Sequence, residues 1–190
     1  MGQKILSHSS YTPDLQSYIS RYFQSQDIHI IEHFDGNPTK TVIAVKNNIP
    51  FIMKVFFKTD LTEEHLFNEE IKKLQDTYNI IYPPSTSYRT VFGVTPVLSI
   101  DNQTKTAAIL IRQYLTYNLR ERIYIEPYLT TIDKVWLSFQ IMFALQSMHD
   151  NGIYHGHLKL QNILLTSYMS VYLSDIATYK PAYIPIDDNT

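Results

Sequence analysis

Cysteine is missing from this chain of 190 residues. Its absence excludes disulfide bonds and zinc sites built on thiolates, although it suits a reducing compartment as well as any other. No apolar run approaches the roughly 20 residues that a membrane-spanning helix requires. The first ten residues, MGQKILSHSS, also lack the apolar stretch of a secretory signal.

Glycine is scarce and net charge is small. The five glycines form no Gly-x-Gly-x-x-Gly loop of the kind that holds phosphates. Lys and Arg total 16 against 18 Asp and Glu, which leaves a formal net charge of -2 and no overall basic field to recruit nucleic acid. With 44% hydrophobic residues, the chain can form a packed core, and its length fits one domain or one domain with two lobes.

Hydrophobic patterning predicts a strand-rich first half with one helix, then helices, then a small terminal hairpin. The expected elements are a short helix at 14–23, strands at 42–45 and 51–57, a helix over 61–78, strands at 95–100 and 106–114, a short helix at 118–125, a long helix at 131–150, and strands at 162–165 and 171–173. This order predicts an α+β protein with two lobes.

The long helix has clear boundaries in the sequence. Thr130 and Asp133 have the spacing of a capping box, and Asn151-Gly152 is a typical helix end. Six apolar residues within the helix recur at three- and four-residue intervals, which predicts a stripe facing the core. They are Ile132, Val135, Trp136, Phe139, Met142 and Phe143.

Polar residues flank the terminal hairpin. Lys159 and Asn162 come at the start of its first strand and Asp175 follows its second, so the hairpin should bring them to one edge. An ammonium, an amide oxygen and a carboxylate together suit phosphate oxygens and Mg²⁺. Lys54, inside the apolar strand FIMKVFF, must either extend to solvent or face an anion.

These residues resemble the signature of protein kinases. HGHLKLQN at 155–162 resembles the catalytic loop H-R-D-L-x-x-x-N, and SDIA at 174–177 resembles the segment that carries D-F-G. The intervals of five positions from His157 to Asn162 and thirteen from Asn162 to Asp175 agree with that pattern. Lys54 in IMKVF resembles the lysine of V-A-I-K.

The resemblance implies a role for each matched residue. His157 stands at the catalytic aspartate position, Lys159 belongs to the catalytic loop, and Asn162 and Asp175 would hold Mg²⁺. The nucleotide, ATP or GTP, would be bound weakly or not at all.

The resemblance also implies the nucleotide contacts. Lys54, Tyr114 and Leu115 would contact the nucleotide, and Glu70 would pair with Lys54, with Glu69 as the weaker candidate.

Within the superfamily, the chain is similar to the kinase-like domain of the regulatory subunit of class III phosphatidylinositol 3-kinase complexes. The stretches that carry this similarity are MKVF, IRQYLTYNLRERI, PYLTTIDKVWLSFQI, HGHLKLQNILLTSY, LSDIATYKPAYIPIDDN and the initial Met-Gly. The resemblance implies an N-lobe at 1–113, with an N-terminal segment at 1–30, and a partial helical C-lobe at 114–190.

Membership of that family further implies a location and partners. The chain would be cytoplasmic and peripheral at endosomal or autophagic membranes, with a lipid-kinase catalytic subunit and other complex subunits as partners. Gly2 would be myristoylated, although Leu6 stands where that motif usually has Ser or Thr and the serine comes one residue later.

Several positions depart from the kinase pattern. His157 replaces an aspartate and brings no negative charge, so we expect phosphoryl transfer to be crippled. Phosphate contacts would come from a non-glycine hairpin near 35–37, and Ile176-Ala177 replaces Phe-Gly. The sequence ends 15 residues after Asp175, where a complete kinase would continue, which indicates a fragment, a truncated gene or a remnant whose apolar helix needs a partner.

Other interpretations remain open. His155 and His157 could ligate zinc with His149 as the nearest third ligand, although an anchoring role for His155 through hydrogen bonds fits the kinase resemblance better. Three functions follow: a regulatory or scaffold pseudokinase that binds a nucleotide, an active serine/threonine kinase in which His157 acts as base, and a ligand-free interaction remnant.

Overall fold

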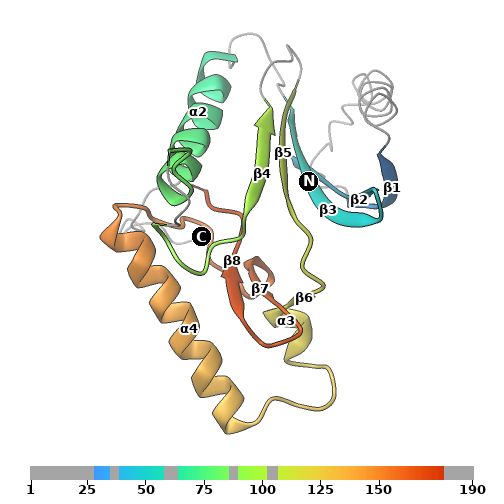
Figure 1. Ribbon diagram of the computed structural model, residues 1–190, viewed down its shortest axis with the longest axis vertical. Helices are drawn as coiled ribbons and strands as arrows, with labels where there is room; N and C mark the ends of the chain where they lie inside the picture. Colours follow the sequence, from blue (N-terminus) through green and yellow to red (C-terminus); the bar gives the residue numbers. More distant parts are fainter. Residues whose placement is uncertain (1–27, 35–38, 58–63, 86–89, 102–106, 178–190) are drawn as a thin grey trace, which may run out of the picture.

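The computed structural model describes residues 28–34, 39–57, 64–85, 90–101 and 107–177. Its elements, in chain order, are β1 (His29–Phe34), β2 (Thr39–Lys46), β3 (Ile49–Phe57), α2 (Glu64–Ile81), β4 (Val97–Asp101), β5 (Ala107–Gln113), β6 (Tyr117–Asn118), α3 (Leu119–Arg122), α4 (Thr131–Asp150), a 3-10 turn η1 (Leu160–Asn162), β7 (Ile163–Leu165) and β8 (Val171–Leu173). The predicted α+β class is confirmed (Figure 1).

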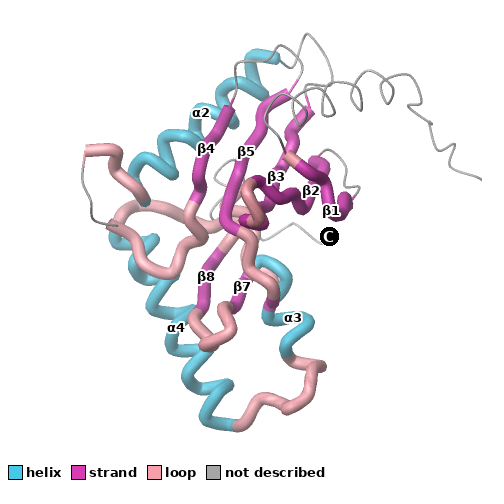
Figure 2. The backbone as a smooth tube through the Cα atoms, turned by 45° about the vertical axis from the view of Figure 1, so that its right-hand side comes forward, coloured by secondary structure: helices cyan, strands magenta, loops and turns pink. Residues whose placement is uncertain are grey.

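Two antiparallel sheets form the framework. The larger has the strand order β1-β2-β3-β5-β4, and the smaller has the order β6-β7-β8. Figures 1 and 2 show α2 beside β4 at the larger sheet, whereas α4 lies beside the β7–β8 hairpin. The segment before β4 joins the two sheets, because Val94 forms a parallel bridge with Leu173 and the Thr95 N–H donates to the Leu173 carbonyl at 2.9 Å.

The β2–β3 hairpin forms where the sequence predicts it. Lys46 pairs with Ile49, so the turn consists of Asn47 and Asn48, whose φ angles are 53° and 62°. Two successive positive φ angles define the turn that matches the twist of a hairpin, and asparagine tolerates this region better than most residues. The sequence thus fixes the register that places Lys54 in the middle of β3.

Alternation along β3 separates its two faces. Phe51, Met53 and Val55 are buried in a cluster with residues of β2 and β5. Because successive side chains of a strand point to opposite faces, Lys54 and Phe56 lie on the other face. Phe56 there packs against the main core. Lys54 therefore faces the side of the sheet on which the main core is built.

The main core connects α2, α4 and both sheets. It contains Leu74, Tyr78 and Ile81 from α2, Leu110 from β5, Val91 and Val94 from the joining segment, and Leu165, Leu173 and Ile176 from the terminal hairpin and the residues after it. Ile71, one turn before Leu74 on α2, is also buried. A single apolar cluster therefore holds the two sheets together around the ends of β3 and β8.

Helix α4 begins and ends as predicted. The Thr130 hydroxyl accepts from the Asp133 N–H, and the Asp133 carboxylate accepts from the Thr130 N–H, which completes the capping box. At the other end, Asn151 is the cap and Gly152 has a φ of 70°, in the left-handed region that glycine adopts without cost.

The predicted core-facing stripe of α4 is wrong. Ile132 is 81% exposed, Met142 71% and Trp136 52%, and the other members of the stripe are also exposed. The buried face instead carries Leu137, Ala144 and Met148. The helix is apolar on both faces, and periodicity finds such faces without showing which one meets the core.

Close contact with the segment before β4 decides which face of α4 is buried. A Cβ built on Gly93 would lie 2.5 Å from the Cβ of Ala144, so the backbone at Gly93 approaches the helix as only glycine allows. Trp136 and Phe139 stack on the opposite face with ring centroids 5.6 Å apart. The exposed face is thus an ordered aromatic surface.

One predicted element differs in length from the observed one, and several predicted features fall on residues that the structure does not describe. The short helix predicted at 118–125 is confined to Leu119–Arg122. The predicted helix at 14–23, the cap at Thr62, the hairpin near 35–37, the turn at 102–103, Gly2 and the tail after 177 lie outside the described residues. Among the helices that the structure describes, none is both long and apolar enough to cross a membrane.

The two faces of α4 predict different costs of truncation. Met148→Ala should lower the free energy of unfolding by about 2–5 kcal/mol, because it empties a filled core position. Met142→Ala, the matched control on the exposed face, should change it by about 0.5 kcal/mol or less. Urea denaturation measures both values. Equal losses would show that the two faces are equally covered in solution.

Candidate functional site

The site is centred on an ion pair between two distant parts of the chain. Lys54 pairs in register with Thr41 of β2 and Leu110 of β5, so the neighbouring strands fix its backbone on both sides. Its Nζ lies 2.5 Å from Oδ2 of Asp175, which follows β8. Both side chains are largely buried, at 16% and 18% exposed. Of the two alternatives predicted for Lys54, solvent or an anion, the structure shows the anion, which is Asp175.

Hydrogen bonds hold the segment around Asp175. The Ser174 N–H donates to the Asn162 carbonyl at 2.8 Å, and the Ala177 N–H donates to the His155 carbonyl at 2.8 Å. Asp175 itself has a φ of 63°, a region that aspartate tolerates better than most residues. The hydrogen bonds of Ser174 and Ala177, on either side of Asp175, hold its backbone in this uncommon conformation, as is frequent at functional sites.

Asn162 organises the loop that precedes β7. It is buried, and its side-chain amide donates to the carbonyl of His157 at 2.8 Å. This bond uses only the amide nitrogen, so the side-chain oxygen keeps its capacity as an acceptor. The side-chain amide of Asn162 thus fixes the backbone at His157, and the main-chain carbonyl of Asn162 accepts from the N–H of Ser174, the residue before Asp175.

His155 has the anchoring role that the sequence suggests. It is 4% exposed, and its Nδ1 accepts from the His157 N–H at 3.3 Å. Burial lowers its pKa below the ordinary value for histidine, so the ring is neutral at physiological pH. A neutral ring with Nδ1 as acceptor suits a fixed structural contact.

His157 and Lys159 occupy the loop at different depths. His157 is half-buried, and its charge is near enough to influence the pKa of Asp175. Lys159 is exposed, although its charge acts on Lys54. In the described ranges, no three His, Cys, Asp or Glu side chains gather as a metal site, and the ring of His149 lies 5.3 Å from that of Tyr154.

The structure does not form the predicted pair between Glu70 and Lys54. Glu70 is exposed on α2, while the ammonium of Lys54 contacts Asp175. Glu69, the weaker candidate, is also exposed and lies 3.7 Å from the ring of His65. Helix α2 turns Ile71 toward the core, and the two preceding glutamates consequently face outward.

Tyr78 is the residue of α2 whose electrostatic interactions reach the site. Its side chain is buried, and its hydroxyl interacts with the charges of Asp175 and Arg112. Burial raises the pKa of the Tyr78 hydroxyl above its ordinary value, so the hydroxyl is neutral. Tyr114 and Leu115, predicted to contact a nucleotide, are half-buried directly after β5.

Arg112 is the site residue that the sequence-based prediction missed. It lies near the end of β5, its side chain is 9% exposed, and its Nε is 3.8 Å from Oδ1 of Asp175. The available signal was an arginine inside the apolar run AAILIRQ, the same kind of signal that singled out Lys54. A buried charge needs a partner, and Asp175 provides it.

Opposing effects set the protonation of the ion pair. Burial by itself would raise the pKa of Asp175, but the charges of Lys54 and Arg112 outweigh it and hold this pKa below the ordinary value. Burial lowers the pKa of Lys54, and the attraction of Asp175 offsets part of that effect. Asp175 is therefore ionised at physiological pH.

Mg²⁺ does not fit this arrangement of side chains. Asn162 and Asp175 are the predicted oxygen ligands, but Oδ2 of Asp175 is in contact with Lys54 and Oδ1 faces Arg112. A divalent cation at either oxygen would lie next to a positive charge, and the single carboxylate is already neutralised. We therefore derive no step through a metal ion.

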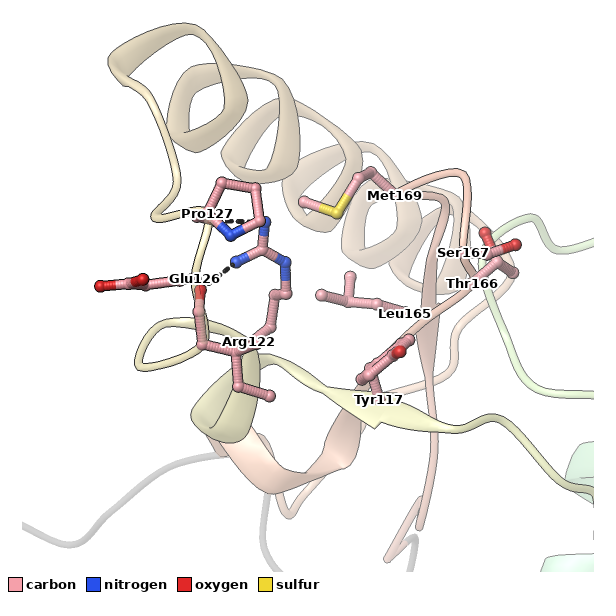
Figure 3. Close-up of a pocket in the computed structure, with 9 residues that line it drawn as sticks. Tyr117, Arg122, Glu126, Pro127, Leu165, Thr166, Ser167 and Met169 are labelled. Carbon is pink, nitrogen blue, oxygen red and sulfur yellow. Dashed lines mark hydrogen bonds between the residues drawn. The ribbon is translucent and has the colours of Figure 1, made fainter.

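A separate cavity of about 320 Å³ lies between α3 and the turn of the terminal hairpin (Figure 3). Arg122 is held there by bonds of 3.0 Å to the carbonyls of Ile125 and Pro127. Glu126 points away from the cavity in Figure 3. Its lining includes none of the predicted site residues, so this cavity is not part of the candidate site.

Removal of the Asp175 charge should destabilise the protein. Asp175→Asn leaves Lys54 and Arg112 buried without a counter-ion, and such a loss costs about 3–5 kcal/mol. Because the pKa of Asp175 is lower in the folded state, its stabilisation is present above the unfolded pKa of about 3.9 and is lost as pH falls through the folded value. The variant should lack this part of the acid dependence.

Urea denaturation from neutral to acidic pH measures both effects. Asp76→Asn is the matched control, because Asp76 is exposed on α2. A wild type and an Asp175→Asn variant of equal stability at neutral pH would contradict the ion pair.

Several curated proteins with similar sequences are named serine/threonine-protein kinase VPS15. The chain is 36% identical over 138 residues to the serine/threonine-protein kinase VPS15 of Arabidopsis thaliana, a match that covers 72% of this chain and 9% of that protein. It is 40% identical over 168 residues to the protein of the same name from Saccharomyces cerevisiae, covering 86% of this chain and 11% of that protein. The chain thus spans about a tenth of the length of these relatives.

Solved structures support the fold independently. The crystal structure of Rad53 residues 1–466 in complex with AMP-PNP matches with a TM-score of 0.62 and 16% sequence identity, covering 80% of this chain and 39% of that one. No protein-family model matches the chain. The kinase-like fold and the sequence similarity together show that the chain belongs to the protein-kinase superfamily, as a relative of part of the serine/threonine-protein kinases VPS15.

Proposed function

We propose that this chain is a kinase-like regulatory or scaffold module of a phosphatidylinositol 3-kinase complex, able to bind a nucleotide but impaired in phosphoryl transfer. The observation that carries the proposal is the contact of 2.5 Å between Lys54 and Asp175, with Asn162 beside it. In a kinase site the corresponding lysine binds phosphate, whereas the asparagine and the aspartate hold the metal ion. Their proximity in this chain supports a nucleotide site, although the base position holds His157.

Nucleotide binding is supported by the placement of the half-buried groups. Lys54 would release Asp175 and bind phosphate oxygens, which an ammonium recognises as a compact point charge. Tyr114 and Leu115 follow β5 and are half-buried, and in this proposal they would contact the base or ribose. ATP and GTP both carry the phosphates that Lys54 would bind.

Impaired catalysis is supported by the surroundings of His157. Its N–H is bound to His155 and its carbonyl accepts from Asn162, so the backbone is fixed as a catalytic loop would require. The imidazole nevertheless supplies neither the negative charge nor the reach of an aspartate. General-base assistance contributes on the order of 10²–10⁴ in rate, which is the loss to be expected.

The scaffold role rests on sequence similarity to the serine/threonine-protein kinases VPS15. In this proposal the partner is a lipid-kinase catalytic subunit, with other complex subunits. The chain would act at endosomal or autophagic membranes, with Gly2 as the site of myristoylation. One myristoyl chain gives only marginal membrane binding, so complex formation would supply the second attachment.

A ligand-free interaction role is the second candidate function. The exposed face of α4 supports it, because Trp136, Phe139 and Phe143 form an ordered row of stacked rings. Exposed apolar patches of this kind mark contact surfaces. In this candidate, Lys54 and Asp175 would have a structural role alone.

A phosphate-incorporation assay tests catalysis. The wild type should transfer no more phosphate to a generic substrate than Lys54→Met does, and His157→Asp should raise transfer by on the order of 10²-fold by restoring the base. Lys134→Met, an exposed lysine on α4, is the control for loss of charge. Wild-type transfer that disappears in both Lys54→Met and Asp175→Asn would establish an active kinase instead.

Co-expression with a class III lipid-kinase catalytic subunit tests the scaffold role. Affinity purification of the tagged chain should recover that subunit in stoichiometric amount. The double variant Trp136→Ser and Phe139→Ser tests whether the exposed face of α4 makes the contact, because it should reduce recovery if it does. Failure of the wild-type chain to recover the subunit would contradict the scaffold proposal.

A further inference from the structure

Arg112 places a second cation inside the site. Its position in β5 is fixed by pairing with Ile52 of β3 and Val97 of β4. One terminal nitrogen of its guanidinium donates to the Gln113 carbonyl at 3.2 Å, which holds the group in place. The charge is buried because the surrounding strand is apolar, and burial lowers the pKa of Arg112 below its ordinary value. Arginine stays charged even so.

The contact between Arg112 and Asp175 is an incomplete pair. The distance of 3.8 Å from Nε to Oδ1 is within ion-pair range but beyond a hydrogen bond. Within the part of the chain that the structure describes, both of these atoms are buried and neither has a hydrogen-bond partner. Such orphaned polar atoms are costly, and they mark positions where a partner or a small shift completes the bonding.

The charges of the site favour an anion. Lys54 and Arg112 face a single carboxylate, and Lys159 acts on Lys54 from the loop. The buried side chains thus carry one uncompensated positive charge. A polyphosphate group would neutralise it, whereas a divalent cation would increase it. Arg112 therefore interacts with the carboxylate that would otherwise bind a metal ion, and its positive charge repels such an ion.

We propose that the site binds a nucleoside triphosphate without a divalent cation, and that Arg112 is the positioning residue that makes this possible. When phosphate draws Lys54 away from Asp175, Arg112 closes the 3.8 Å gap and remains as counter-ion. Asp175 is then never left as a buried unpaired charge, and no metal ion is needed to neutralise it. This inference rests on the nucleotide binding in the proposed function.

Affinities for ATP and GTP, measured by calorimetry with Mg²⁺ and separately with EDTA, test the proposal. For the wild type, the two dissociation constants for a given nucleotide should agree within about threefold. Arg112→Met should bind at least about tenfold more weakly in EDTA than in Mg²⁺, because the metal must then neutralise Asp175. Arg112→Lys keeps a cation and should restore the wild-type ratio.

Controls separate this effect from loss of folding. Arg120→Met, an exposed arginine on α3, should leave both constants unchanged. A purely structural role of Arg112 would weaken binding equally with and without Mg²⁺, and that result would overturn the proposal. If Arg112→Met does not fold, the wild-type ratio alone decides the outcome.

Two further results are distinguishable from one another. Wild-type binding that requires Mg²⁺ would overturn the metal-independent site and leave the proposed nucleotide binding intact. Absence of binding to either nucleotide, with or without Mg²⁺, would overturn both.

Discussion

The ion pair between Lys54 and Asp175 joins the two halves of this structure. One partner is held in the middle of the five-stranded sheet, and the other follows the terminal hairpin more than a hundred residues later. Neither charge can be buried alone, so the sheet and the hairpin must come together for either to be stable. The apolar cluster of α2, α4 and the hairpin joins the same parts of the chain, and its burial contributes favourable free energy to their association.

Arg112 changes the electrostatics of that pair. If Lys54 were the single cation, it would neutralise Asp175, and any movement of Lys54 would leave the carboxylate without a counter-ion. With two, Asp175 has a second cation, Arg112, at 3.8 Å, which would remain near it in the proposed nucleotide complex. Glu70 is exposed and contacts neither cation. Among the described side chains, Asp175 is therefore the negative charge inside the site. The same charges that disfavour a metal ion thus favour an anion.

The loop around His157 is held by bonds that do not depend on the side chain at that position. Asn162 and His155 fix the backbone of His157 through hydrogen bonds that involve main-chain atoms of His157. Main-chain bonds do not depend on the side chain at that position, so an aspartate could be replaced there without loss of the loop. The backbone of this loop is therefore compatible with different side chains at position 157.

Much of the architecture could be predicted from local sequence because local forces decide it. The Asn47-Asn48 turn, the capping box at Thr130 and the intervals from His157 to Asn162 to Asp175 depend on backbone conformation and spacing. The exposed stripe of α4, the outward position of Glu70 and the burial of Arg112 could not be found in this way, because each depends on which face of an element meets another. Sequence periodicity shows that a helix has an apolar face. Tertiary packing, such as that of Gly93 against Ala144 and of α2 against the sheet, decides which face is buried. The sequence by itself determined the elements, the loop and the spacing of the site residues. Only the tertiary structure decided the partners of the buried charges, since a charge takes its partner from whatever the folded chain places within reach.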